Sequence, residues 1–159
     1  MEHAVDRHIL RLRFACAGML AGIAACAVIT YVLPIPVRPA LPQGEALLWG
    51  FAFLAAVNLV TIMPVYRVML AAPRRVYAVG QQADRLLAAH FSAHLVAFAR
   101  LEAVALLGLA LFFLSGHRGW FAIFGGVAAL GMLLLWPDRG KVEALLAAGR
   151  PQVSATASG

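Results

Sequence analysis

Four long apolar segments constrain the fold of this chain more than any other feature. They cover residues 14–33, 46–66, 96–115 and 119–136, which are 20, 21, 20 and 18 residues. A hydrocarbon core about 30 Å thick needs about 20 helical residues at 1.5 Å per residue, so each segment can cross it. Because backbone groups in lipid must bond within the segment, the segments must be helices. The sequence therefore predicts an all-α membrane protein, a four-transmembrane-helix bundle formed by residues 1–148.

The composition excludes an ordinary soluble domain. Hydrophobic residues make up 63% of the chain and charged residues 13%, whereas soluble domains are about half apolar and a quarter charged. The net charge of +6 does not indicate nucleic-acid binding, because the basic residues lie between apolar segments rather than on one face of a soluble fold. We therefore expect the lipid bilayer, and no nucleic acid, as a partner.

The basic residues predict the orientation of the spans. Of the 13 lysines and arginines, Arg38 and Arg118 fall in the first and third connections between the spans, and the other 11 (13 − 2) lie on the opposite side of the membrane. Basic residues are enriched on the cytoplasmic side. We therefore expect a multi-pass protein of the cell inner membrane with both termini in the cytoplasm.

The connections differ in character. Residues 34–42 contain four prolines and should form an extended outer spacer, whereas residues 115–119 allow only a tight hairpin. Pro64 should kink the second span near its cytoplasmic end. The tail 149–159 is small and polar, and we expect it to be disordered.

The stretch between the second and third spans should be a cytoplasmic connection followed by helix. It contains Pro73 and a helix-breaking Gly80, and nothing after residue 81 stops a helix. We predict one helix over 81–115, whose first third lies outside the membrane or at its surface.

The first span has an alternative interpretation. Arg11, Arg13 and an apolar stretch precede the sequence IAAC at residues 23–26, which is typical of a lipoprotein signal peptide cleaved before Cys26. However, the chain stays apolar through Leu33, and cleavage would leave three spans. These observations favour a retained first span. Cys16 and Cys26 lie ten residues apart on one helix and cannot form a disulfide.

A polar stripe enters the third span. His90, His94, Phe98 and Glu102 recur every four residues, so they share one helix face. Glu102 should lie about 10 Å inside the cytoplasmic edge, where an ionisable group is a functional candidate. Asn58 and Thr61 of the second span should lie in the same layer. They are therefore candidate hydrogen-bond partners of Glu102.

Two function hypotheses follow from this stripe. Glu102 could relay protons or cations with His90 and His94, or it could fix helix register through hydrogen bonds. The second is favoured, because no other carboxylate falls within a span. The two histidines have a spacing that suits a metal, but further ligands are missing. We expect no metal, no cofactor and no enzyme activity.

Small residues predict close helix packing. Gly18 and Gly22 form one narrow face, and Gly125, Gly126 and Ala129 form another. Such faces let helix backbones approach closely in lipid. They would serve either packing within the bundle or contact with a second copy or a larger membrane complex.

The last third of the chain carries a resemblance. The sequence RLEA at residues 100–103, the turn at Gly116, the sequence WPDRGK at 136–141 and an amphipathic stretch at 142–148 resemble small bacterial four-span membrane proteins of unknown function. Arg100 and Ala103 depart from those proteins, which carry Trp or Leu and Gly there. The resemblance implies a membrane protein of unassigned role and transfers no site.

Two other families with a carboxylate in a span fit less well. Glu102 is too shallow for a proteolipid rotor subunit, and small multidrug transporters carry their glutamate in the first span. The sequence therefore predicts a non-enzymatic accessory or structural subunit of a membrane complex. The alternative is a small proton- or cation-coupled transporter that uses Glu102.

Overall fold

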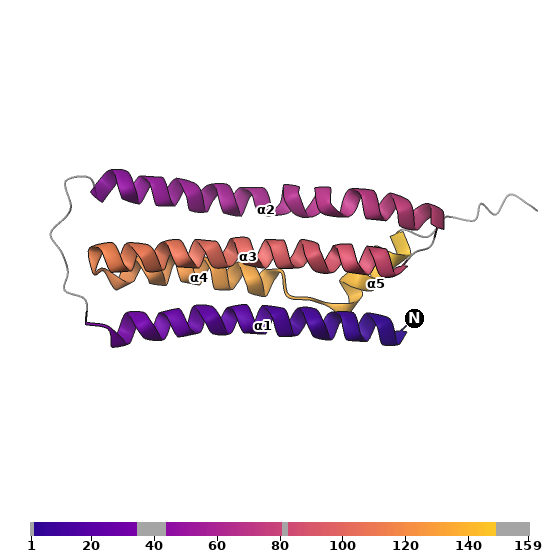
Figure 1. Ribbon diagram of the computed structural model, residues 1–159, viewed down its shortest axis with the longest axis horizontal. Coiled ribbons are helices and arrows are strands. Elements are labelled where there is room, and N and C mark those ends of the chain that lie inside the picture. Colours follow the sequence, from indigo (N-terminus) through magenta and orange to yellow (C-terminus); the bar gives the residue numbers. More distant parts are fainter. Residues whose placement is uncertain (1, 35–43, 81–82, 149–159) are drawn as a thin grey trace, which may run out of the picture.

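The computed structural model describes residues 2–34, 44–80 and 83–148, and the described chain is all-helical (Figure 1). Five helices follow in order: α1 (Glu2–Val32), α2 (Gly44–Gly80), α3 (Ala83–Ser115), α4 (Arg118–Leu134) and α5 (Arg139–Ala148). Most of the proline-rich connection and the whole tail 149–159 lie outside the described residues, so the predictions for them remain predictions.

Three of the helices, α1 to α3, are long and apolar enough to cross a membrane. The fourth predicted span, residues 119–136, corresponds to α4, which ends at Leu134, and α5 follows it at an angle of 57°. The pair counts as a fourth candidate only if it forms one bent span. The prediction of an all-helical protein with apolar helices of membrane-spanning length is therefore confirmed.

Helix α3 is the centre of the arrangement. Helices α1, α2 and α4 all pack on it, and α1 and α2 lie on opposite sides of it (Figure 1). The tight turn between α3 and α4 is as predicted. Gly116 has a φ of 74° there, and its amide donates to the carbonyl of Phe112 over 2.7 Å. This left-handed conformation suits glycine, which has no Cβ, and it ends α3.

Helix α2 is longer than its apolar segment. It passes through Pro64, continues for 14 residues past Tyr66 through Pro73, and ends at Gly80. Leu70 and Tyr77 are buried in this extension, so tertiary packing offsets the backbone hydrogen bonds that the prolines cannot donate. Apart from residues 81–82, which are not described, the predicted connection is therefore mostly helix. Helix α3 begins at Ala83, close to the predicted position.

The buried residues form two separate cores. The larger, which we call the main core, joins α1 to α4 along the apolar segments. The smaller, the end core, lies where α1 and α3 begin and where α2 ends, and α5 covers it. It consists of Val5, Ile9, Tyr77, Leu86, Leu87, Val142, Leu145 and Leu146. Because α5 bends away from α4, its apolar side chains reach this second core.

We call this end of the molecule the basic end. The ends of α1, α2 and α5 that form it carry Arg7, Arg11, Arg74, Arg75, Arg139 and Lys141. Helices of 31, 37 and 33 residues are about 47, 55 and 50 Å long, which exceeds a hydrocarbon core of about 30 Å. The excess length lies at the basic end, with the end core.

Candidate functional site

A layer of polar side chains lies at the basic end, beside the two cores. His8 of α1, Tyr66 of α2, and His90 and His94 of α3 form it, and we call it the histidine layer. All three imidazoles are buried, and their rings contact in series, with centroids 5.3 Å apart for His8 and His90 and 4.3 Å for His90 and His94. Three helices that are separate in sequence thus meet at one buried polar site.

The hydrogen bonds of the layer restrict its protonation. Nε2 of His8 lies 3.0 Å from Nδ1 of His90, so one of these nitrogens donates and the other must be unprotonated. Nδ1 of His94 lies 3.1 Å from the carbonyl oxygen of His90 and 3.4 Å from the Tyr66 hydroxyl. The His8–His90 bond therefore joins α1 to α3, and the contact of Tyr66 brings α2 to the same layer.

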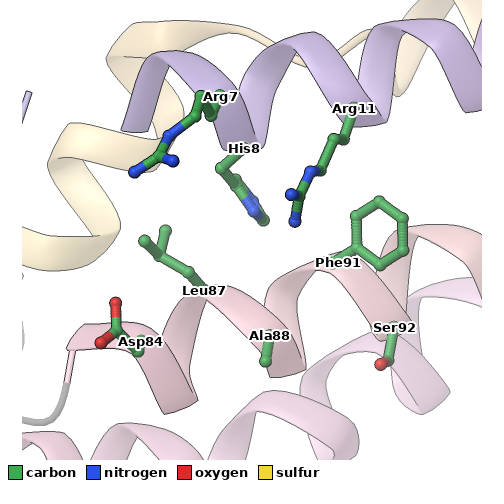
Figure 2. Close-up of a pocket in the computed structure, with 8 residues that line it drawn as sticks. All are labelled: Arg7, His8, Arg11, Asp84, Leu87, Ala88, Phe91 and Ser92. Atoms are coloured by element: carbon green, nitrogen blue, oxygen red, sulfur yellow. The ribbon is translucent and has the colours of Figure 1, made fainter. Parts of the chain in front are cut away.

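Two cavities flank the histidine layer. The one between α1 and α3 has a volume of about 460 Å³, and the eight residues that line it are Arg7, His8, Arg11, Asp84, Leu87, Ala88, Phe91 and Ser92 (Figure 2). The second has about 320 Å³ and lies between α2, α3 and the α4–α5 connection. His90, His94 and Tyr66 line the second cavity, together with Arg74 and Lys141. The layer thus separates two spaces that both carry cationic side chains.

Three of the four residues of the predicted stripe on α3 contact one another, and Glu102 lies apart from them. His90, His94 and Phe98 are buried and contact in series, with the His94 and Phe98 ring centroids 5.8 Å apart. Glu102 is half-buried and faces α1, since a Cβ built on Gly22 would lie 3.5 Å from its Oε1. The fully buried ring of Phe98 lies between His94 and Glu102 along the stripe.

Asn58 and Thr61 do not meet Glu102. Both lie on α2, and both donate to carbonyls of their own helix, Asn58 to Leu54 over 2.9 Å and Thr61 to Val57 over 2.5 Å. The cross-helix partner of Thr61 is Arg100, whose guanidinium donates to the threonine hydroxyl. Within the described part of the chain Glu102 has no hydrogen bond or ion pair, so the predicted polar cluster is divided between two sides of α3.

The predicted small-residue faces are also divided. Gly18 and Gly126 have no atom within 4 Å of a built Cβ, and Gly125 faces the ring of Phe121 on its own helix. Ala129 is half-buried. Close approaches between helices occur instead at Gly108, where a Cβ would lie 2.6 Å from the Cβ of Phe124, and at Gly131, where it would lie 2.6 Å from Cδ2 of Leu101. Contacts of Gly18 and Gly126 with a second copy of the chain therefore remain a prediction.

Sequence reasoning missed His8 and Tyr66. His8 lies before the first apolar segment and 82 residues from His90, so no local spacing connects them. A usable signal was the burial expected at α1, where Val5, His8, Ile9 and Leu12 recur at helical spacing. Across residues 2–34, 44–80 and 83–148, no group of three or more His, Cys, Asp or Glu side chains is placed to hold a metal ion.

Comparison with protein families, with curated proteins and with solved structures finds no match to this chain.

Proposed function

We propose that this chain is a multi-pass inner-membrane protein with four spans and both ends in the cytoplasm, and that it serves as a non-enzymatic accessory or structural subunit of a membrane complex. Helix α4 supplies the fourth span in this proposal, and α5 lies at the basic end. The basic end, with 11 of the 13 cations of the sequence on its side of the predicted topology, faces the cytoplasm.

The observation that carries the structural role is the filling of the main core beyond Glu102. Between Glu102 and the α3–α4 turn, the buried side chains are apolar and mostly large; they are Val104, Ala105, Leu111, Phe112, Phe121 and Phe124. Thr30, which is also buried at that end, donates its hydroxyl to the carbonyl of Ala27 over 2.7 Å. A close-packed apolar core of this kind favours a role in packing over one in conducting ions.

Helix α2 supports contact with lipid or with another membrane protein. It packs on α3 along one side, and large apolar residues on its remaining surface are exposed, with Phe53 at 72%, Val60 at 73% and Val68 at 73%. Exposed apolar surface of this extent is covered in the cell by acyl chains or by a partner helix. An accessory subunit needs such a face.

Flux measurements separate this proposal from a transporter. The wild type, Glu102→Gln and the control Glu45→Gln are reconstituted in liposomes with a pH-sensitive dye, and a proton or cation gradient is imposed. Glu45 is the matched control because its carboxylate is exposed in the first turn of α2. We expect no flux in any of the three. Wild-type flux that Glu102→Gln abolishes and Glu45→Gln retains, at unchanged thermal stability, would establish the transporter instead.

Mass measurement after gentle detergent purification tests the subunit role directly. We expect a second polypeptide in stoichiometric amount, and cross-links from the exposed face of α2 should reach it. A homogeneous monomer that yields no cross-linked partner from native membranes contradicts the proposal.

A further inference from the structure

The cavity of about 460 Å³ between α1 and α3, which we call the charged pocket, has no role in the proposal above. Figure 2 shows Arg7, His8 and Arg11 projecting from α1 toward α3. The opposite wall is formed by the α3 residues Asp84, Leu87, Ala88, Phe91 and Ser92. Its volume lies within the range of about 300–1,000 Å³ that is usual for ligand sites. The pocket combines two guanidinium groups with one carboxylate.

The charges in this pocket are not neutralised by each other. Arg7 donates its Nε to the carbonyl of His3 over 3.2 Å, which leaves its terminal nitrogens for other partners. Among the described residues, neither Arg7 nor Arg11 forms an ion pair with Asp84, although all three line the same cavity. His8 is bound to His90 at 3.0 Å and so forms a fixed part of the wall.

The pocket lies where lipid headgroups would be. Arg11 precedes the first apolar segment by three residues, or about 4.5 Å along a helix. Leu10 and Phe14, on either side of it in sequence, are 55% and 71% exposed and suit contact with acyl chains. Guanidinium groups bind phosphate through paired N–H donors, and basic pockets at this depth are typical phosphate-headgroup sites.

Asp84 gives the pocket a second, opposite charge at a defined position. It lies six residues before His90, whose ring contacts His8, and therefore about 9 Å farther from the apolar segments along α3. Starting from the apolar segment, the charges thus follow the order Arg11, Arg7, Asp84. A phosphoethanolamine lipid presents acyl chains, then phosphate, then ammonium in the same order.

We propose that the charged pocket binds the headgroup of a phosphoethanolamine lipid, with its phosphate at Arg7 and Arg11 and its ammonium at Asp84. The inference rests on the proposed placement of the basic end at the membrane surface, but not on the accessory role. A lipid bound here bridges α1 and α3.

Native mass spectrometry of the full chain in detergent micelles tests the site. The protein is titrated with short-chain phosphatidylethanolamine, with short-chain phosphatidylglycerol and with inorganic phosphate. We expect one tightly held phosphatidylethanolamine, with phosphatidylglycerol about tenfold weaker and free phosphate weaker still, because only the first ligand pairs both charges of the pocket. Equal affinity for inorganic phosphate would overturn the lipid assignment in favour of a free-phosphate site.

The variants assign the contacts. Arg11→Ala and Arg7→Ala should each weaken the binding of both lipids about tenfold. Because the two variants are made separately, failure of one to fold still leaves the other as a test. Asp84→Asn should abolish the preference for phosphatidylethanolamine. Arg85→Ala is the matched control, because Arg85 is an exposed neighbour that does not line the pocket. The proposal is wrong if Arg85→Ala weakens binding as much as Arg11→Ala does, or if Asp84→Asn leaves the preference intact.

These measurements are independent of the accessory role. Loss of lipid selectivity leaves partner purification unaffected, and a chain without a partner subunit can still hold the lipid.

Discussion

At the scale of single residues, Gly108 is a position where the backbones of α3 and α4 approach closely. An added Cβ would lie 2.6 Å from the Cβ of Phe124 and 3.1 Å from the carbonyl oxygen of Trp120. Because backbone cannot yield as a flexible side chain does, Gly108→Ala should destabilise the protein by about 1–3 kcal/mol. Thermal unfolding in detergent measures this.

The matched control for Gly108 is Gly126→Ala, where nothing lies within 4 Å of the new methyl group. We expect its midpoint temperature to equal that of the wild type. Equal midpoints for both variants would mean that the two helices are farther apart than described here. A change of oligomeric state in Gly126→Ala alone would assign that face to contact between copies.

The His8–His90 hydrogen bond should couple the beginnings of α1 and α3. In a double-mutant cycle of His8→Ala and His90→Ala, we expect a coupling of about 0.5–1.5 kcal/mol, the usual net contribution of one hydrogen bond. The free energy of unfolding of the four proteins measures it. Additive effects of the two substitutions would indicate that the two rings act independently.

The residue scale also shows how far sequence reasoning reached. The i, i+4 spacing correctly predicted that His90, His94 and Phe98 share a face, because a helix fixes that relation locally. Counting residues from the membrane edge placed Asn58, Thr61 and Glu102 at similar depth but could not fix the angle around each helix. In the structure Thr61 faces Arg100, and Glu102 faces Gly22. The direction in which each side chain points around its helix is set by the packing of three helices, which local spacing does not give.

At the scale of elements, α5 and the extended ends of α1, α2 and α3 form a small core of their own. Ile9 is 6% exposed within this end core, whereas its neighbour Leu10 is 55% exposed and outside it. Ile9→Ala should therefore lower the free energy of unfolding by about 2–5 kcal/mol, because it leaves a cavity. Leu10→Ala should lower it much less.

Limited trypsin digestion reports the effect of Ile9→Ala at the basic end, where the arginines and lysines are concentrated. We expect faster cleavage there in Ile9→Ala, while the main core remains intact. Similar cleavage rates in Ile9→Ala and Leu10→Ala would mean that the end core does not hold these helices together.

The extent of α2 could not be predicted from local preferences. Pro64 and Pro73 each remove one backbone donor, and a local interpretation ends or bends the helix near them. The continuation to Gly80 depends on Leu70 and Tyr77, which are 1% and 4% exposed against other elements. Tertiary burial of this kind is visible only once the helices are assembled. The apolar helices themselves were predictable, because an apolar segment long enough to cross a bilayer must satisfy its backbone hydrogen bonds internally.

At the scale of the whole molecule, the short length of the last span makes topology a sharp test. Helix α4 has 17 residues and is about 25 Å long, slightly less than a hydrocarbon core of about 30 Å. In the proposed topology, reporters fused to the N-terminus, between α2 and α3, and after Ala148 report the cytoplasm, and a reporter at His117 reports the exterior. A reporter after Ala148 that reads external would show that α4 does not cross.

The central position of α3 determines the order in which this protein can assemble. Helices α1 and α2 pack on α3 and lie on opposite sides of it, not on one another. A ribosome produces both of them before the helix that joins them. In the proposed topology, the first two helices therefore enter the bilayer as separate units during synthesis, and the bundle forms only after the third helix has been made.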